Sequence, residues 1–208
     1  MKTYTPTVRL RKTTREERTA YHEAGHAVAG YLLRIPFEYV TIIPDEDKGS
    51  LGHILYDGFG EDFQPDVDEP EEVRRKLEPR ILCALAGEAA EHLFSGMRNL
   101  PGASGDYLSV LNSVMYVCGS TNEADPYATW LYHRAQGMLR NRITWAQVKA
   151  LATALLAQKH INYETACQVI AQAQADLLAS RRSPQASEAL ARRIKQAEGK
   201  DDGNRSVE

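Results

Sequence analysis

Polar and apolar positions first fall into a regular pattern about a dozen residues into the chain. Residues 1–12 show no periodicity, whereas Thr14 and Glu17 have the spacing of a capping box, which starts a helix. Apolar residues then recur every three or four positions as far as Tyr31, and Pro36 cannot continue a helix. We therefore predict a helix that begins near Thr14 and ends before Pro36.

Two short runs after this helix have the pattern of β-strands. Residues 39–43 are rich in β-branched side chains and end at Pro44, and residues 51–56 follow a polar turn. Residues 57–69 are acidic and contain glycine and proline, which is typical of a surface loop. We predict a small sheet that is followed by a loop.

Helical spacing returns in the rest of the chain. An apolar stripe extends from Pro70 to Gly96, and Pro79 within it marks a kink or a boundary between two helices. The next helix is expected from about Ser104 to Gly119. Its predicted apolar face consists of Leu108, Leu111, Met115 and Cys118. Further helices are expected over residues 126–140, 145–159, 163–180 and 184–198.

These patterns define the expected fold class and domain organisation. Helices dominate, so we expect a mainly α fold with a small β-sheet, and 208 residues suffice for one compact domain. The domain should span residues 14–180, after a flexible N-terminal segment of residues 1–13. Residues 181–208 should contain a further helix and a disordered polar tail.

Composition and charge exclude several classes of protein. With 43% hydrophobic and 25% charged residues, the chain has the composition of an ordinary globular protein, which excludes a disordered, collagen-like or disulfide-dense class. Its 25 Lys and Arg against 28 Asp and Glu leave no basic excess for a nucleic acid or an anionic membrane. Because no apolar run could act as a signal sequence or span a bilayer, we expect no membrane insertion and a cytoplasmic location. Cys83, Cys118 and Cys167 lie far apart beside apolar residues, as reduced core thiols do.

The predicted first helix contains an HExxH motif formed by His22, Glu23 and His26. On a helix both imidazoles lie on one face, a turn apart, where they can hold one zinc ion. Zinc lowers the pKa of its bound water to about 7, and a neighbouring carboxylate can take the proton as the water attacks a carbonyl. A chain of this composition contains the motif by chance roughly 0.014 times. The sequence predicts a zinc site with Glu23 as general base. The alternative is that His22 and His26 are ordinary polar residues on a half-exposed helix.

Other segments around the motif carry a resemblance to a known family. They are AYHEAGHAVAGYLL at residues 20–33, VTIIP at 40–44, LG at 51–52, LAGEAAEHLFSG at 85–96 and GASGD at 102–106. In this order they closely resemble the peptidase domain of the FtsH family of AAA proteases, and residues 138–164 are similar to the family's C-terminal helical segment. The resemblance covers roughly residues 14–175 and implies a zincin-like helical peptidase domain.

The resemblance also implies a third zinc ligand. In the family, zinc is held by the two histidines of HEAGH and by an aspartate at the start of a later helix, and the matching position is Asp106. A third protein ligand leaves the fourth position open, as in catalytic zinc sites. A helix-capping or first-turn acid is the other interpretation of Asp106. Glu91 matches the glutamate of the family's AAE string, which implies a hydrogen bond from a zinc-bound imidazole; a surface acid paired with a cation is the alternative.

Some residues near these segments have no ligand role or depart from the family. His53 and His92 have no motif support, and none of the cysteines has the spacing of a metal site. Glu88 stands where the family usually has arginine, and Gly105 stands where it usually has asparagine. Both departures concern the local network rather than the three ligands.

The leading functional hypothesis is a zinc metalloendopeptidase. It would hydrolyse peptide bonds in unfolded or flexible polypeptides by Glu-assisted attack of zinc-bound water, with substrate added as a strand beside residues 51–56. The main alternative is a non-catalytic peptide-binding or regulatory module that retains the fold, and a weaker one is a zinc hydrolase for a non-peptide amide. The presence of Glu23 favours the enzyme, because a binding module needs no carboxylate beside the water.

Family members also carry an N-terminal membrane anchor and an ATPase module that unfolds substrates, and the sequence has neither pattern. It therefore resembles a peptidase domain standing alone. We expect an unfolded polypeptide as substrate and no nucleic-acid partner, and folded proteins should be poor substrates unless a separate ATPase unfoldase docks. A homo-oligomer is left open, because the ATPase ring contributes to the assembly of the family.

Overall fold

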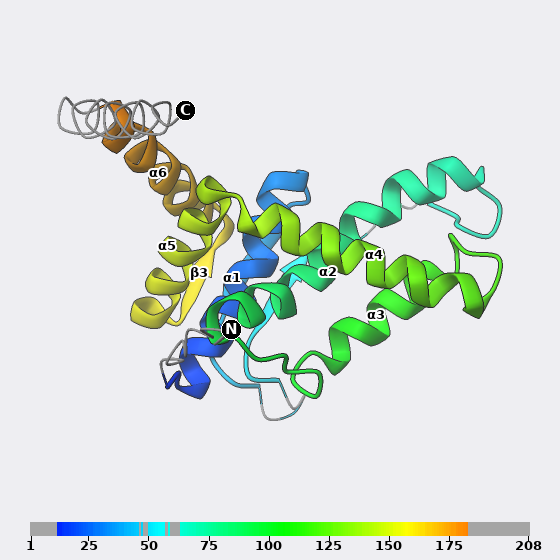
Figure 1. The fold of residues 1–208 in the computed structure, drawn as a ribbon, viewed down its shortest axis with the longest axis horizontal. Coiled ribbons are helices and arrows are strands. Elements are labelled where there is room, and N and C mark those ends of the chain that lie inside the picture. The colour runs from blue at the N-terminus through cyan, green and yellow to red at the C-terminus, as the bar shows by residue number, and fades with distance from the viewer. Residues whose placement is uncertain (1–11, 46, 48–49, 57, 59–62, 183–208) are drawn as a thin grey trace, which may run out of the picture.

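The computed structural model describes residues 12–45, 47, 50–56, 58 and 63–182 (Figure 1). Its elements are α1 (Arg15–Leu33), β1 (Phe37–Thr41), β2 (His53–Tyr56), α2 (Pro70–Ser95), α3 (Ser104–Val114), α4 (Thr121–Arg140), α5 (Arg142–Gln158), β3 (His160–Asn162) and α6 (Tyr163–Arg182). The expected fold class, mainly α with a small β-sheet, is confirmed. The expectations for residues 1–11 of the N-terminal segment, for the helix over 184–198 and for the polar tail concern residues outside the described part of the chain.

Helix α1 forms as its capping pattern predicts. The Glu17 amide donates to the Thr14 hydroxyl over 3.1 Å, and the Thr14 amide donates to the Glu17 carboxylate over 2.9 Å. At the other end, Arg34 adopts a left-handed conformation with φ 59° and donates to carbonyls of the last turn. Almost every residue from Ala20 to Gly30 is buried, so α1 passes through the core.

Helix α2 packs against α1 at very short range. At Gly25 of α1, a β-carbon would lie 2.5 Å from the Ala86 carbonyl oxygen and 2.6 Å from the Ala90 β-carbon, so the approach requires glycine. Helix α2 continues through Pro79, so the alternative of a boundary between two helices is wrong. Apolar residues on both sides of Pro79 are buried in the same core, which offsets the one backbone hydrogen bond that proline removes.

The small sheet has the strand order β2-β1-β3, and both pairings are antiparallel. Val40 of β1 lies opposite Ile54 on one side and Ile161 on the other. The first two strands were predicted from their pattern, whereas β3 lies in residues that we expected to be the connection between two helices. Among the strands described, β2 and β3 occupy the edges, and β2 contacts the HExxH helix through the Tyr56 hydroxyl, which donates to the His26 carbonyl.

Helices α3 and α4 differ from the prediction in their ends and in their buried faces. Helix α3 ends at Val114 rather than Gly119, and it buries Val110 and Val114. The expected apolar face is mostly exposed: Leu108 is 61% exposed, Leu111 45% and Met115 47%. Helix α4 begins at Thr121, five residues before the predicted start at Pro126, which lies inside the helix. Helical periodicity predicted the position of α3, but it assigned the wrong side of the helix to the core.

The remaining helices complete the core around α1. Helices α5 and α6 lie together at one end of the molecule, and α3 lies with parts of α2 and α4 at the other end (Figure 1). The cysteines are free thiols; Cys83 and Cys118 are buried, as their apolar neighbours predicted, whereas Cys167 is only half-buried. None of the helices in the described residues combines the length and apolar character needed to cross a membrane.

Candidate metal centre and active site

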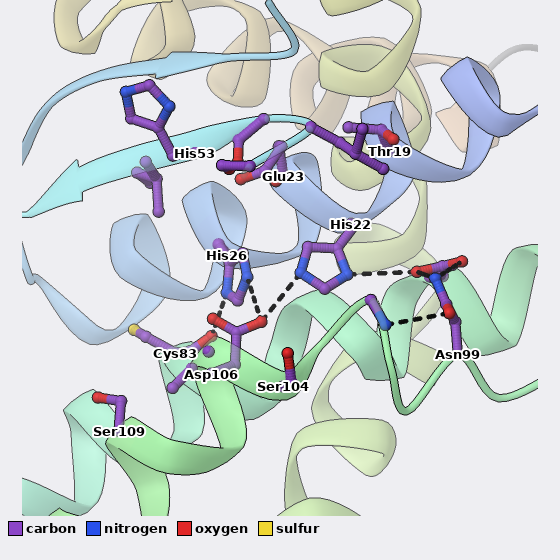
Figure 2. Close-up of a pocket in the computed structure, with 18 of the residues that line it drawn as sticks. Thr19, His22, Glu23, His26, His53, Cys83, Asn99, Ser104, Asp106 and Ser109 are labelled. Atoms are coloured by element: carbon purple, nitrogen blue, oxygen red, sulfur yellow. Dashed lines mark hydrogen bonds and ion pairs between the residues drawn. The ribbon is translucent and has the colours of Figure 1, made fainter. Parts of the chain in front are cut away.

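Three side chains that are distant in sequence converge at the centre of the molecule. His22 and His26 project from one face of α1, and Asp106 approaches them from the first turn of α3 (Figure 2). The Asp106 carboxylate lies 3.0 Å from Nε2 of His22 and 3.4 Å from Nε2 of His26. One potential ligand atom from each residue lies within 4.8 Å of the other two. The structure thus places together all three residues that the sequence proposed as zinc ligands.

The donor atoms are oriented for a single cation. Both histidines are buried, and the ring nitrogen that faces away from the centre has a partner in each case. Nδ1 of His26 donates to the Cys83 carbonyl over 2.7 Å, and Nδ1 of His22 lies 3.4 Å from the Glu91 carboxylate. Such outer contacts fix the ring orientation and leave Nε2 free for a metal. Two imidazole nitrogens and one carboxylate oxygen are a ligand set that fits catalytic zinc.

Glu91 lies behind His22 and is only 3% exposed. It is therefore not a surface acid. The Asn99 amide donates to its carboxylate over 3.0 Å, and Nε of Arg18 lies 4.0 Å from it. Glu91 connects the first histidine to the segment that leads into α3.

Glu23 lies beside the ligands and is almost completely buried between α1 and the chain that enters β2 (Figure 2). A β-carbon at Gly52 would lie 3.0 Å from the Glu23 carboxylate oxygen and 2.7 Å from the Thr41 carbonyl oxygen. Gly52 therefore permits the close approach of this segment to Glu23. Burial raises the pKa of Glu23, and the charges of His22 and His26 offset only part of this increase. A carboxylate with a raised pKa is better suited to accept a proton near neutral pH.

The ligands also interact strongly with one another. Burial lowers the pKa of His22, but hydrogen bonds to Asp106 and Glu91 and the charge of Glu23 raise it overall, to about 10. Burial raises the pKa of Asp106, but the charges and hydrogen bonds of the two histidines hold it well below its ordinary value. A cation that binds at this centre must therefore displace protons from the imidazoles.

Comparison with known proteins agrees with this arrangement. Residues 9–117 match the family model described as Peptidase family M41. The chain belongs to this family. It is 30% identical over 154 residues to the ATP-dependent zinc metalloprotease FtsH of Haemophilus influenzae, an alignment that covers 73% of this chain and 21% of that protein. The FtsH of Buchnera aphidicola subsp. Schizaphis graminum is also 30% identical over 154 residues, with 73% and 22% covered.

A third relative, the ATP-dependent zinc metalloprotease FtsH of Heterosigma akashiwo, is 37% identical over 94 residues, which are 44% of this chain and 13% of that protein. The resemblance to the FtsH peptidase domain is therefore confirmed. This M41 chain spans about a fifth of the length of the first two relatives.

A cleft of about 890 Å³ surrounds the candidate metal centre. Gly52 and Ile54 of the β2 segment line one side of the cleft, and Ser109 and Val110 of α3 line another. The Tyr56 hydroxyl at the end of β2 donates to the His26 carbonyl over 2.7 Å, which ties the strand to the motif helix. The volume is in the range of sites that enclose ligands, and the edge strand runs along the cleft.

The other two histidines discussed for the sequence have protein partners and do not join the three ligands. Nε2 of His53 lies 3.0 Å from the Tyr39 hydroxyl, and Nδ1 of His92 lies 3.1 Å from the Tyr132 hydroxyl. In the part of the chain that the structure describes, only one group of His, Cys, Asp and Glu has metal-binding spacing.

Several residues that shape the centre gave no chemical signal in the sequence. At Gly87 of α2, a β-carbon would lie 2.2 Å from Nε2 of His26, so glycine leaves the space that the imidazole occupies. Asn99 and the Cys83 carbonyl also contact site residues and were not identified. Gly105, in contrast, has no described atom within 4 Å of a β-carbon, so sterics do not require glycine beside Asp106.

Proposed function

We propose that this chain is a zinc-dependent metallopeptidase, with zinc held by His22, His26 and Asp106 and with Glu23 as the general base. The observation that carries the proposal is the convergence of two imidazole nitrogens and one carboxylate oxygen within 4.8 Å of one another, inside a cleft and beside a buried glutamate. Membership of peptidase family M41 supports the same reaction class.

Each residue has a distinct task in this mechanism. Zinc, when bound, supplies a Lewis acid that acidifies a water molecule and polarises the carbonyl under attack. Glu23 takes the proton from the water and then delivers it to the departing amine. Glu91 and the Cys83 carbonyl hold the two imidazoles in the orientation that directs both Nε2 atoms toward one metal position.

The position of β2 supports an extended polypeptide as the substrate. A flexible segment could pair with the free edge of β2, so that main-chain hydrogen bonds position a peptide carbonyl next to the ligands. Main-chain pairing accepts many sequences but requires an unfolded segment. We therefore propose unfolded or flexible polypeptides as substrates. A folded substrate would need a separate ATPase unfoldase as a partner, and the relatives are named ATP-dependent proteases.

The burial of Glu23 distinguishes the enzyme from a non-catalytic binding module. Glu23 is 5% exposed, and removal of a carboxylate from water costs several kcal/mol unless its charge is compensated. A domain that only binds peptides would gain nothing from a buried carboxylate beside a metal centre. An enzyme needs that group as its base.

The test compares the unsubstituted chain with Glu23→Gln on a casein-like unfolded substrate. The amide preserves the size of the side chain but cannot accept the proton, so we expect zinc to remain near one per chain while turnover falls by at least about 100-fold. Glu164→Gln, the same change on an exposed residue of α6, is the matched control and should retain full activity. Equal turnover in the Glu23→Gln variant would refute the mechanism, and a zinc content that survives replacement of both His22 and His26 by Ala would refute the site.

A further inference from the structure

The segment that delivers Asp106 to the metal centre is held by two carboxylates from α2. Glu88 and Glu91 lie one helical turn apart, and they contact consecutive residues of the connection between α2 and α3, namely Arg98 and Asn99. The contact of Glu91 with His22 gives that carboxylate an evident role. Glu88 touches none of the ligands, yet it is the more deeply buried of the two, with 1% of its surface exposed.

Glu88 forms one end of a network that reaches the first turn of α3. Nε of Arg98 donates to the Glu88 carboxylate over 2.8 Å, and the second donor of the guanidinium lies 3.4 Å from it. The same guanidinium lies over the Tyr132 ring, 4.4 Å from its centre, and donates to the Tyr107 hydroxyl. Because Tyr107 is adjacent to Asp106, Arg98 connects the rigid α2 helix to the residue beside the proposed ligand.

The loop that enters α3 is also held by Asn99, whose side-chain oxygen accepts from the Gly102 amide over 3.2 Å and whose carbonyl accepts from the Ala103 amide over 3.1 Å. The residue at the N-cap of α3, Ala103, is buried but has no polar side chain to cap the helix, and both Ser104 and Gly105 are exposed. Gly102 and Gly105 flank this turn, and glycine leaves the backbone a wide range of conformations. The contacts of Asn99 reach only the residues before Ser104, so they do not by themselves fix the first turn that carries Asp106. The planar guanidinium of Arg98, which donates in fixed directions to Glu88 and Tyr107, supplies that restraint.

We propose that Glu88 and Arg98 are positioning residues that hold Asp106 against the two imidazoles through Tyr107. This inference rests on the proposed function, because it requires Asp106 to be a zinc ligand. It gives a task to a buried glutamate at a position where the family usually has arginine. Glu88 and Arg98 then act on metal binding, although neither touches the metal.

The experiment measures zinc affinity by competition with a chelator, together with thermal unfolding of each metal-free variant. Arg98→Gln and Tyr107→Phe both break the connection to α3, and Tyr107→Phe does so while leaving the pair of Glu88 and Arg98 intact. We expect each to weaken zinc binding by about 10-fold or more, as removal of outer contacts commonly does. Arg134→Gln is the matched control, because Arg134 also lies over an aromatic ring, that of Trp130, but does not line the cleft. It should bind zinc with unchanged affinity.

A double-variant cycle separates positioning from a general structural role. In the background of Asp106→Ala, Arg98→Gln should cause no further loss of zinc affinity, because the ligand on which it acts is absent. Cobalt(II), used in place of zinc, should give Arg98→Gln a visible spectrum shifted toward that of Asp106→Ala. Unchanged zinc affinity in both Arg98→Gln and Tyr107→Phe, or an equal loss in the Asp106→Ala background, would overturn this inference alone. An unsubstituted chain that binds neither zinc nor cobalt would overturn it together with the proposed function.

Discussion

The space that Gly87 leaves for His26 allows a sharp test of the metal centre. In Gly87→Ala, the new β-carbon would lie 2.2 Å from Nε2, 2.5 Å from Cε1 and 2.7 Å from Cδ2 of the imidazole. Ordinary contact begins at 3.4 Å, so the ring would have to retreat by about 1.2 Å, the difference between 3.4 and 2.2 Å. The hydrogen bond of 2.7 Å from Nδ1 of His26 to the Cys83 carbonyl opposes this movement.

A displacement of this size is incompatible with metal ligation at the same point. Distances between a metal and its ligands are kept within about 0.2 Å, and a misplacement of 1 Å at an active site can cost about 100-fold. We therefore expect Gly87→Ala to weaken zinc binding by at least about 100-fold, or about 2.7 kcal/mol. Alanine gains about 0.5–1 kcal/mol over glycine within a helix, whereas loss of the contact with Cys83 costs about 1–3 kcal/mol. The metal-free chain should thus lose no more than about 2.5 kcal/mol of stability, slightly less than the expected effect on zinc binding.

The assay combines a zinc titration against a chelator with urea unfolding of the metal-free chain. Gly137→Ala is the matched control, because Gly137 lies in helix α4 and no described atom approaches its β-carbon position within 4 Å. This variant should be more stable by about 0.5–1 kcal/mol and bind zinc normally. If Gly87→Ala bound zinc as tightly as the unsubstituted chain, His26 would not be a ligand in the position that the structure gives it.

Three other predictions follow from the same contacts. Gly25→Ala should destabilise the chain by about 1–3 kcal/mol in urea unfolding, because its β-carbon would lie 2.5 Å from the Ala86 carbonyl oxygen; equal or higher stability would contradict the close packing of α1 and α2. In the metal-free chain the pKa of His22 is raised from 6.5 to about 10, so the stability that its ion pairs contribute is complete below pH 6.5 and is lost as the pH rises toward 10. Asp106→Asn should flatten this pH dependence of the unfolding free energy, and an unchanged slope would exclude the pair. Zinc binding at pH 7 should release a proton, which calorimetry in buffers of different ionisation enthalpy would detect.

Local signals in the sequence predicted most helices but not all of their ends and faces. The capping box at Thr14 and the glycine at position 96 act within one turn of a helix. The start of α1 and the end of α2 therefore lie where these signals predict. Strand β3 has three residues and forms because Ile161 pairs with Val40 of β1, a long-range contact that leaves no periodic pattern. In α3 both sides of the helix are apolar, and periodicity cannot decide whether Leu108 or Val110 is buried. Tertiary packing buries Val110 and leaves Leu108 exposed.

The metal centre shows the same division between local and long-range information. His22, Glu23 and His26 share one helix, so their spacing alone places them together. Asp106 lies 84 positions after His22, and only the family resemblance connected the two. Gly87 was not identified, because its contribution is the absence of a side chain at a contact between two helices. Nothing in the composition of a sequence distinguishes such a glycine from others.

The two parts of the proposed ligand set differ in how firmly the fold holds them. The histidines project from α1, which is buried along much of its length and packs against α2 at glycine and alanine positions, so changes there affect folding and metal binding together. Asp106 lies in the first turn of α3, where Ser104 and Gly105 are exposed and side-chain contacts such as that of Arg98 with Tyr107 supply the restraint. Tyr107→Phe should therefore change metal affinity with little loss of stability, whereas Arg98→Gln also leaves the buried Glu88 carboxylate without its partner. Metal binding can therefore vary at the third ligand with little change to the fold.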